Sequence, residues 1–160
     1  MKNVAFLCTG NSARSIRAEA ILNAEAKGKF KAFSAGSYPA GKVNPFAIEL
    51  VEQRDYPTMV YAEKAGTNSP RQAHRVLDFV FTVCDNAAAE VCPIWPGQPI
   101  TAHWGVEDPA AVEGDRRRQT KSFVKAFNVL QRRISLFASL PLYQLDRLSL
   151  QTKLRDIGKQ

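Results

Sequence analysis

Residues 2–22 read KNVAFLCTGNSARSIRAEAIL, and this stretch indicates the fold class. Its first part, Asn3–Leu7, is a short apolar run typical of a buried strand, and a polar turn containing Gly10 follows it. Apolar residues then recur at helical spacing, at Ile16, Ala20, Ile21 and Ala24. Gly28 ends this second element. A strand, a loop and a helix in succession are the beginning of a βαβ unit.

The rest of the chain continues the alternation. Further strands are expected at Ala32–Ala35, Asp78–Cys84 and Ile100–His103. Asn44-Pro45 has the residues of a helix start, for a helix that runs to about Gln53. A long amphipathic helix is marked by apolar residues at Phe123, Phe127, Leu130, Ile134 and Phe137. Pro141 ends it. A last short helix is expected from Leu145, Leu148, Leu150 and Leu154. The pattern predicts an α/β fold whose parallel sheet binds ligands at the carboxyl ends of its strands.

Length and composition indicate one soluble domain. The chain has 160 residues, of which 45% are hydrophobic and 23% charged. Its longest apolar runs, Val4–Cys8 and Phe79–Cys84, are far shorter than the ~18 residues that span a membrane. Lys2 and the apolar residues after it are too few for a secretory signal. A cytoplasmic protein without a membrane partner is therefore expected.

The net charge and the cysteine count indicate which kinds of partner and reaction to expect. The formal net charge of +7 favours an anionic partner without choosing between phosphate, arsenate, nucleic acid and lipid headgroups. Three cysteines cannot all pair with one another. Thiols in a cytoplasmic chain more often serve catalysis, metal binding or redox cycling than a disulfide framework.

The loop Cys8–Ser15 has the features of an oxyanion site. Backbone N–H groups at a helix N-terminus converge on one point and bind a tetrahedral anion, and Gly10 permits the close approach. The guanidinium of Arg14 is able to hold two oxygens of that anion. The same positive field lowers the pKa of the Cys8 thiol, so that a nucleophilic thiolate faces the anion. The alternative is a buried structural cysteine and an arginine on a solvated helix face.

Asp108-Pro109 follows the expected fourth strand. Cleavage of a bond to a tetrahedral centre needs a proton for the departing oxygen, and the carboxylic acid of Asp108 is a candidate donor. Aspartate before proline is also a common way to open a turn. A proton donor and a turn residue are therefore both open interpretations of Asp108.

Cys84 and Cys92 are candidates for a redox pair. A second thiolate is able to attack a sulfur adduct on Cys8, and a third is able to resolve the resulting disulfide. The pair is eight positions apart, which fits zinc poorly even with His74 or His103 as further ligands. Cys84 also fits a buried cysteine at a strand end.

Taken together, these segments resemble the arsenate reductase branch of the low-molecular-weight tyrosine phosphatase superfamily, over about Lys2 to Leu140. The matching stretches are Phe6–Ser15, Thr82–Asn86, Val91–Pro93 and His103–Pro109. The resemblance implies a three-layer α/β sandwich, with a four-stranded parallel sheet flanked by helices. It implies a phosphatase-like domain over residues 1–140. Residues 141–160 extend beyond it, as an extra helix packed on the same domain or as a dimer contact, in a monomer or weak dimer.

The resemblance also implies site residues and partners. Arsenate or phosphate is held by Thr9, Gly10, Asn11, Ser12, Ala13, Arg14 and Ser15. Cys8 attacks arsenate, Asp108 protonates the departing oxygen, and Cys84 attacks Cys8. Cys92 then takes over the disulfide, which thioredoxin or a glutaredoxin-type protein reduces. No tightly bound cofactor is implied beyond a potassium ion, whose ligands are Asn11, Glu19 and Ser34.

Besides the extension after Pro141, this sequence departs from the family pattern in two places. The redox cysteines of well-known relatives are one residue closer together than Cys84 and Cys92, which bears on the identity of the reductant. Ala13 stands where cysteine is common.

Three functions are compatible with these residues. Arsenate reduction uses all three cysteines, whereas a phosphatase that hydrolyses a phosphocysteine leaves Cys84 and Cys92 without a role. Tyrosine phosphatases of this type place aromatic residues after the Asp-Pro pair, and this chain has Ala110-Ala111. A basic protein that binds nucleic acid or a partner is the third, but no nucleic-acid-binding signature accompanies the charge.

Overall fold

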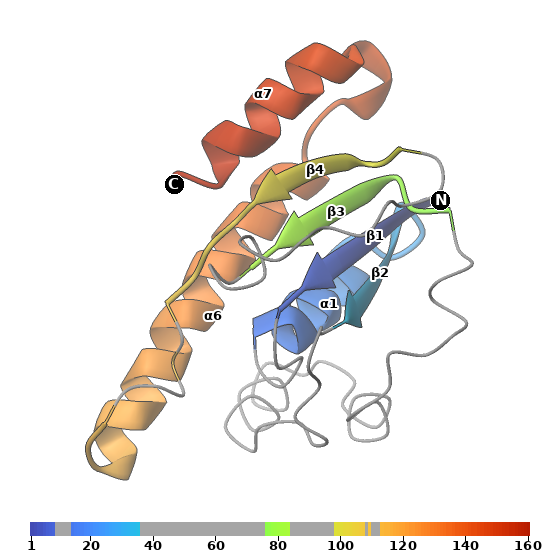
Figure 1. Cartoon of the computed structure of the whole chain (residues 1–160). Coiled ribbons are helices and arrows are strands. Elements are labelled where there is room, and N and C mark those ends of the chain that lie inside the picture. Colours follow the sequence, from blue (N-terminus) through green and yellow to red (C-terminus); the bar gives the residue numbers. More distant parts are fainter. Residues whose placement is uncertain (9–13, 36–75, 84–97, 108, 110–112) are drawn as a thin grey trace.

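The computed structural model of the chain describes residues 1–8, 14–35, 76–83, 98–107, 109 and 113–160. Its strands are β1 (Lys2–Leu7), β2 (Phe30–Ala35), β3 (Phe79–Thr82) and β4 (Ile100–His103). The helices in this part of the chain are α1 (Arg14–Glu25), α6 (Arg116–Ala138) and α7 (Arg147–Ile157), with a short 3-10 helix, η2, at Leu142–Gln144. Figure 1 shows these elements.

The four strands form one parallel sheet in the order β2-β1-β3-β4. Val4 is paired with Ala32 on one side and with Phe79 on the other, so β1 lies inside the sheet. Because all four strands run in the same direction, their carboxyl ends meet at one edge. The predicted parallel α/β class is confirmed.

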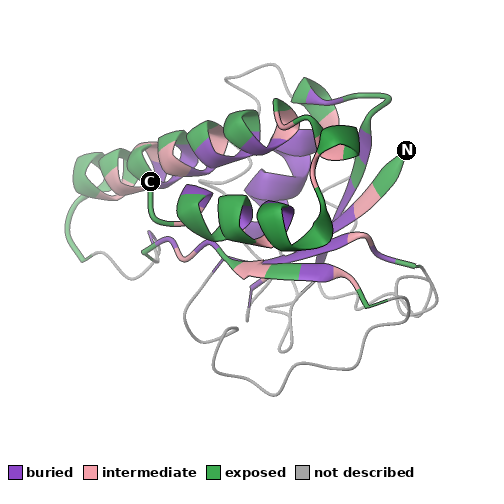
Figure 2. Cartoon of the chain, turned by 90° about the horizontal axis from the view of Figure 1, so that it is seen from above, coloured by how far each residue is buried: buried purple, intermediate pink, exposed green. Residues whose placement is uncertain are grey.

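One face of the sheet is covered by all three described helices. Alternate side chains of β1, such as Val4 and Phe6, join a buried cluster with residues of α1, α6 and α7. Ala5 belongs to a smaller cluster on the opposite face, with Phe33 and Val80. Figure 2 shows that the buried sides of α6 and α7 face the sheet and that their outer sides are exposed.

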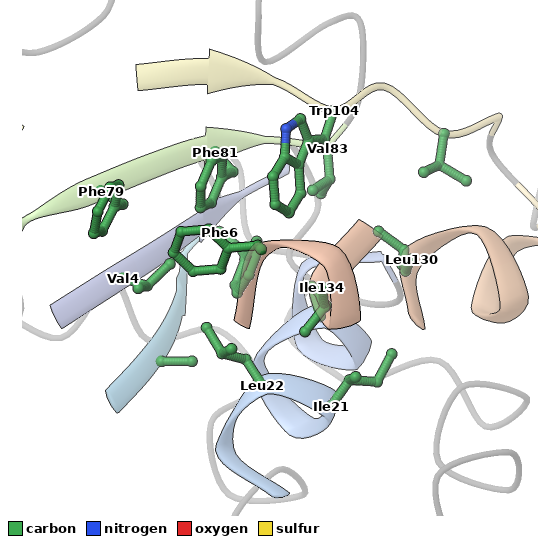
Figure 3. Close-up of a cluster of buried hydrophobic side chains, with 14 of the residues drawn as sticks. Val4, Phe6, Ile21, Leu22, Phe79, Phe81, Val83, Trp104, Leu130 and Ile134 are labelled. Carbon is green, nitrogen blue, oxygen red and sulfur yellow. The ribbon is translucent and has the colours of Figure 1, made fainter. Parts of the chain in front are cut away.

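Aromatic rings fill the centre of the larger cluster (Figure 3). The rings of Phe81 and Trp104 stack with their centroids 3.9 Å apart, and Phe137 from α6 meets Phe81 edge-on at 5.2 Å. Trp104 is completely buried, and its indole Nε1 donates to the carbonyl of Leu154 in α7 over 2.9 Å. This indole therefore belongs to the core.

The predicted stripe of the long helix is confirmed. All five of its apolar residues are buried: Phe123, Phe127, Leu130, Ile134 and Phe137. The helix begins where the Asp115 side chain accepts a hydrogen bond from the Arg118 backbone N–H over 2.9 Å. Asp146 caps α7 in the same way, and the Ser149 N–H that donates to it lowers the pKa of that carboxyl.

Some details of the expected elements differ in the structure. Ala24 is exposed, because it lies in the last turn of α1, beyond the stretch that is buried on all sides. β2 begins two residues earlier than expected, since Phe30 already pairs with Lys2. Leu148 is 78% exposed, and Leu145 precedes α7 as the C-cap of η2. The helix expected at Asn44–Gln53 lies outside the described residues.

None of the helices in the described ranges is both long enough and apolar enough to cross a membrane.

Candidate active site

The candidate nucleophile lies where β1 ends. Cys8 directly follows Leu7 and is 4% exposed, and α1 begins at Arg14 on the other side of the loop. The structure therefore places the thiol and the guanidinium at the two ends of a strand-to-helix connection, as predicted. The loop residues Thr9, Gly10, Asn11, Ser12 and Ala13 lie outside the described residues.

Arg14 is anchored to the segment that follows β4. Its Nη1 donates to the carbonyl of Val106 over 2.9 Å, and its side chain is half-buried. The Val106 N–H in turn donates to the carbonyl of Val83, just after β3, over 3.1 Å. The guanidinium is thus held at the carboxyl edge of the sheet, and the alternative of an arginine on a solvated helix face does not fit.

The carboxyl ends of β3 and β4 are joined by side chains as well as by backbone. The Thr82 hydroxyl and the His103 Nδ1 are 2.8 Å apart, and the Trp104 N–H donates to the Thr82 carbonyl over 2.7 Å. His103 is exposed and lies in β4. Within the described ranges no three His, Cys, Asp or Glu side chains are grouped in a way that would hold a metal ion.

Two of the three predicted potassium ligands are in contact. Glu19 of α1 and Ser34 of β2 are both buried, and the Ser34 hydroxyl donates to the Glu19 carboxylate. Oxygen atoms of this kind are the ligands that hard cations prefer, so the donor set fits potassium. Asn11 lies outside the described residues.

The remaining predicted catalytic residues also lie outside the described residues: Cys84, Cys92 and Asp108. Their neighbours in the chain are described. Val83, before Cys84, is completely buried. Asp108 is flanked by the exposed Glu107 and the buried Pro109.

Sequence reasoning missed two buried arginines. Arg17, one turn after Arg14, is completely buried, and its Nη2 donates to the Phe123 carbonyl. Its guanidinium carbon lies 5.1 Å from the centre of the Phe127 ring, which ties α1 to α6. Its place between Ile16 and Ala18 was the available signal. Arg133 of α6 is 6% exposed and is hydrogen-bonded to the Gly105 carbonyl.

The sequence model of the low molecular weight phosphotyrosine protein phosphatases matches residues 3–148. The chain belongs to this family. The matched residues span the described sheet and the connection between Cys8 and Arg14.

Within the family, the chain is similar to arsenate reductases. It is 32% identical over 137 residues to an arsenate reductase of Halalkalibacterium halodurans, with 86% of this chain and 95% of that protein covered. Among solved structures, an arsenate reductase in the phosphate binding state is 25% identical, with a TM-score of 0.68, covering 87% of this chain and 98% of the other.

The name of a second similar structure includes a reductant, thioredoxin. It is the Corynebacterium glutamicum thioredoxin-dependent arsenate reductase, which is 26% identical with a TM-score of 0.57. The alignment covers 86% of this chain and 63% of that one.

Proposed function

We propose that this phosphatase-family chain reduces arsenate to arsenite. The observation that carries the proposal is the anchored Arg14, held at the carboxyl edge of the sheet across the loop from the buried Cys8 thiol. An arginine fixed in this way offers a planar set of donors to a tetrahedral oxyanion beside a nucleophilic sulfur. The arsenate reductases among its relatives, and the phosphate-bound state of one, support the same substrate class.

The first chemical step joins sulfur to arsenic. The Cys8 thiolate attacks the arsenic atom, an oxygen leaves with a proton supplied by Asp108, and water is released. N–H groups of Thr9–Ser15 and the guanidinium of Arg14 hold the remaining oxygens. A thiol-bound arsenate on Cys8 is the product of this step.

In the next steps two electrons pass to arsenic, and the resulting disulfide is transferred from one pair of cysteines to another. The Cys84 thiolate attacks the Cys8 sulfur, which forms a Cys8–Cys84 disulfide while the arsenic leaves with the electron pair as arsenite. The Cys92 thiolate then attacks the Cys84 sulfur and releases Cys8 as a thiolate. A dithiol protein reduces the Cys84–Cys92 disulfide, and the thioredoxin-dependent relative makes thioredoxin the first candidate.

A coupled assay tests the proposal. The reduced chain, thioredoxin and its reductase are mixed with arsenate, and NADPH consumption and arsenite are both measured. A parallel reaction replaces thioredoxin with glutathione and glutaredoxin. Arsenite formed in proportion to NADPH in either reaction supports arsenate reduction, and no arsenite in both reactions contradicts it.

Replacement of Cys92 with serine is expected to stop multiple turnover of arsenate after about one equivalent of arsenite. The first two thiols still react, but the Cys8–Cys84 disulfide then has no third thiol to resolve it. Quantifying arsenite per mole of enzyme measures this limit. If the Cys92→Ser variant turned over arsenate with thioredoxin at the unmodified rate, the three-cysteine relay would be wrong.

Phosphoester hydrolysis is the second candidate function, and the family match favours it. The same attack by Cys8 on phosphorus gives a phosphocysteine, which water hydrolyses. Cys92→Ser is expected to leave this activity unchanged, which separates the two functions within one variant.

Asp108→Asn is expected to slow the first chemical step by about 10²- to 10⁴-fold, because an amide supplies no proton to the departing oxygen. Rapid-quench measurement of p-nitrophenol released from its phosphate reports this step, because the phenol leaves when Cys8 attacks. Glu107→Gln is the matched control, since it removes the neighbouring exposed carboxylate. An unchanged rate in Asp108→Asn would remove this residue from the acid role.

A further inference from the structure

The segment that follows β4 contacts two arginines from different helices. Arg14 of α1 donates to the Val106 carbonyl over 2.9 Å, and Arg133 of α6 donates through Nη1 to the Gly105 carbonyl over 3.0 Å. The two acceptors belong to consecutive residues. Figure 1 shows this part of the chain running from the end of β4 along α6.

Arg133 is an unusual residue for its position. It is 6% exposed, and its Nη2 donates to the Gln160 carbonyl over 3.2 Å. Burial lowers the pKa of this guanidinium. Among the described residues, this guanidinium donates to the main-chain oxygens of Gly105 and Gln160, and its Nε has no hydrogen-bond partner. An apolar side chain would fill such a site at lower desolvation cost, so the two hydrogen bonds are what distinguish arginine at this position.

The helix α7 packs against the same segment. The Trp104 indole donates to the Leu154 carbonyl, and Gly158 lies directly against the turn out of β4. A Cβ at Gly158 would be 2.6 Å from the His103 carbonyl oxygen and 2.8 Å from Cδ1 of Trp104. Only glycine permits this approach. Most of α7 lies beyond residues 3–148, which match the family model.

We propose that Arg133 is a positioning residue for Arg14, the arginine that holds the oxyanion, and that α7 supports it in this role. Arg133 fixes the Gly105 carbonyl, and the flexible glycine then presents the next carbonyl, that of Val106, to Arg14 in a single orientation. This inference rests on the proposed function, in which Arg14 holds the substrate. It makes the orientation of the Arg14 guanidinium depend on Arg133, which lies more than one hundred residues later in the chain.

The experiment measures oxyanion binding directly, without turnover. The reduced full-length chain is treated with iodoacetamide at increasing concentrations of inorganic phosphate. Alkylation of the Cys8 peptide is followed by mass spectrometry, so that Cys84 and Cys92 do not interfere. The phosphate concentration that halves the alkylation rate gives the apparent Kd.

Arg133→Met is expected to raise this apparent Kd by about 10-fold, the size of one lost charge-assisted hydrogen bond. Alkylation without phosphate should change less than about 2-fold, because Arg133 does not contact the thiol. Arg132→Met is the matched control: it removes the same charge from the exposed neighbouring position and should leave the Kd unchanged. Equal weakening in both variants, or in neither, would overturn the positioning role.

A double-mutant cycle decides whether Arg133 acts through Arg14. Arg14→Lys combined with Arg133→Met should bind phosphate within about 2-fold of Arg14→Lys alone. Multiplied effects would overturn the inference. Gly158→Ala gives a second test should Arg133→Met fail to fold: it removes no charge and should weaken phosphate binding in the same direction.

The two proposals fail in different ways. If phosphate and arsenate do not protect Cys8 in the unmodified chain, the proposed function itself is contradicted. If they protect it, and Arg14→Lys loses this protection while Arg133→Met keeps all of it, only the positioning role is wrong.

Discussion

Replacement of Cys8 with serine is expected to abolish arsenate reduction and phosphoester hydrolysis together. A serine hydroxyl stays protonated at neutral pH, so the nucleophile is lost, and oxygen cannot form the disulfide that passes electrons to arsenic. A loss of at least about 10³-fold is expected in both activities, as for removal of other nucleophiles that act with partners as a unit. Single-turnover arsenite formation and p-nitrophenyl phosphate hydrolysis measure it.

The fold should survive this change. Cys8 is buried at the end of β1, and a thiol-to-hydroxyl exchange alters one atom of the side chain, so thermal unfolding should shift by only a few degrees. Cys92→Ser serves as the comparison, because it retains the first step and loses only the last exchange. Arsenite formation by Cys8→Ser above about one-tenth of the unmodified rate would place the nucleophile elsewhere.

The strands were predictable because each is a short apolar run between polar or glycine-containing turns. β3 is buried along its whole length, as its apolar run, which contains only Thr82 as a polar residue, indicated. The start of β2 was missed because Lys29 and Lys31 flank Phe30 and break the apolar pattern. In α1, every residue from Ser15 to Leu22 is buried, so no single apolar face described the helix.

The site was predictable only where it is local in sequence. Cys8 and Arg14 lie within one short loop, and the chemistry of that loop pointed to both of them. The Val106 carbonyl that holds Arg14 is 92 residues away, and Arg133 is 28 residues from Gly105. A backbone carbonyl is present in every residue and carries no sequence signal, so its choice as an acceptor depends on the folded chain.

Arg14→Lys is expected to raise the apparent phosphate Kd of the Cys8 site by about 30- to 300-fold. Lysine keeps the positive charge but replaces a planar set of five donors by a compact ammonium, whose three donors do not match two oxygens side by side while also reaching the Val106 carbonyl. Because the oxygens gain negative charge in the transition state, the first chemical step should slow further, by about 10²- to 10³-fold. Phosphate protection of Cys8 and single-turnover arsenite formation report the two effects separately.

Arg116→Lys is the matched control, because it makes the same exchange at the exposed first turn of α6 and should change neither quantity. An equal fall in phosphate affinity for both variants would mean that the general basic charge of the protein attracts the anion. An Arg14→Lys chain that bound phosphate and reduced arsenate like the unmodified one would contradict this role of Arg14. Its hydrogen bond to Val106 would then tie α1 to the segment after β4 without contributing to anion binding.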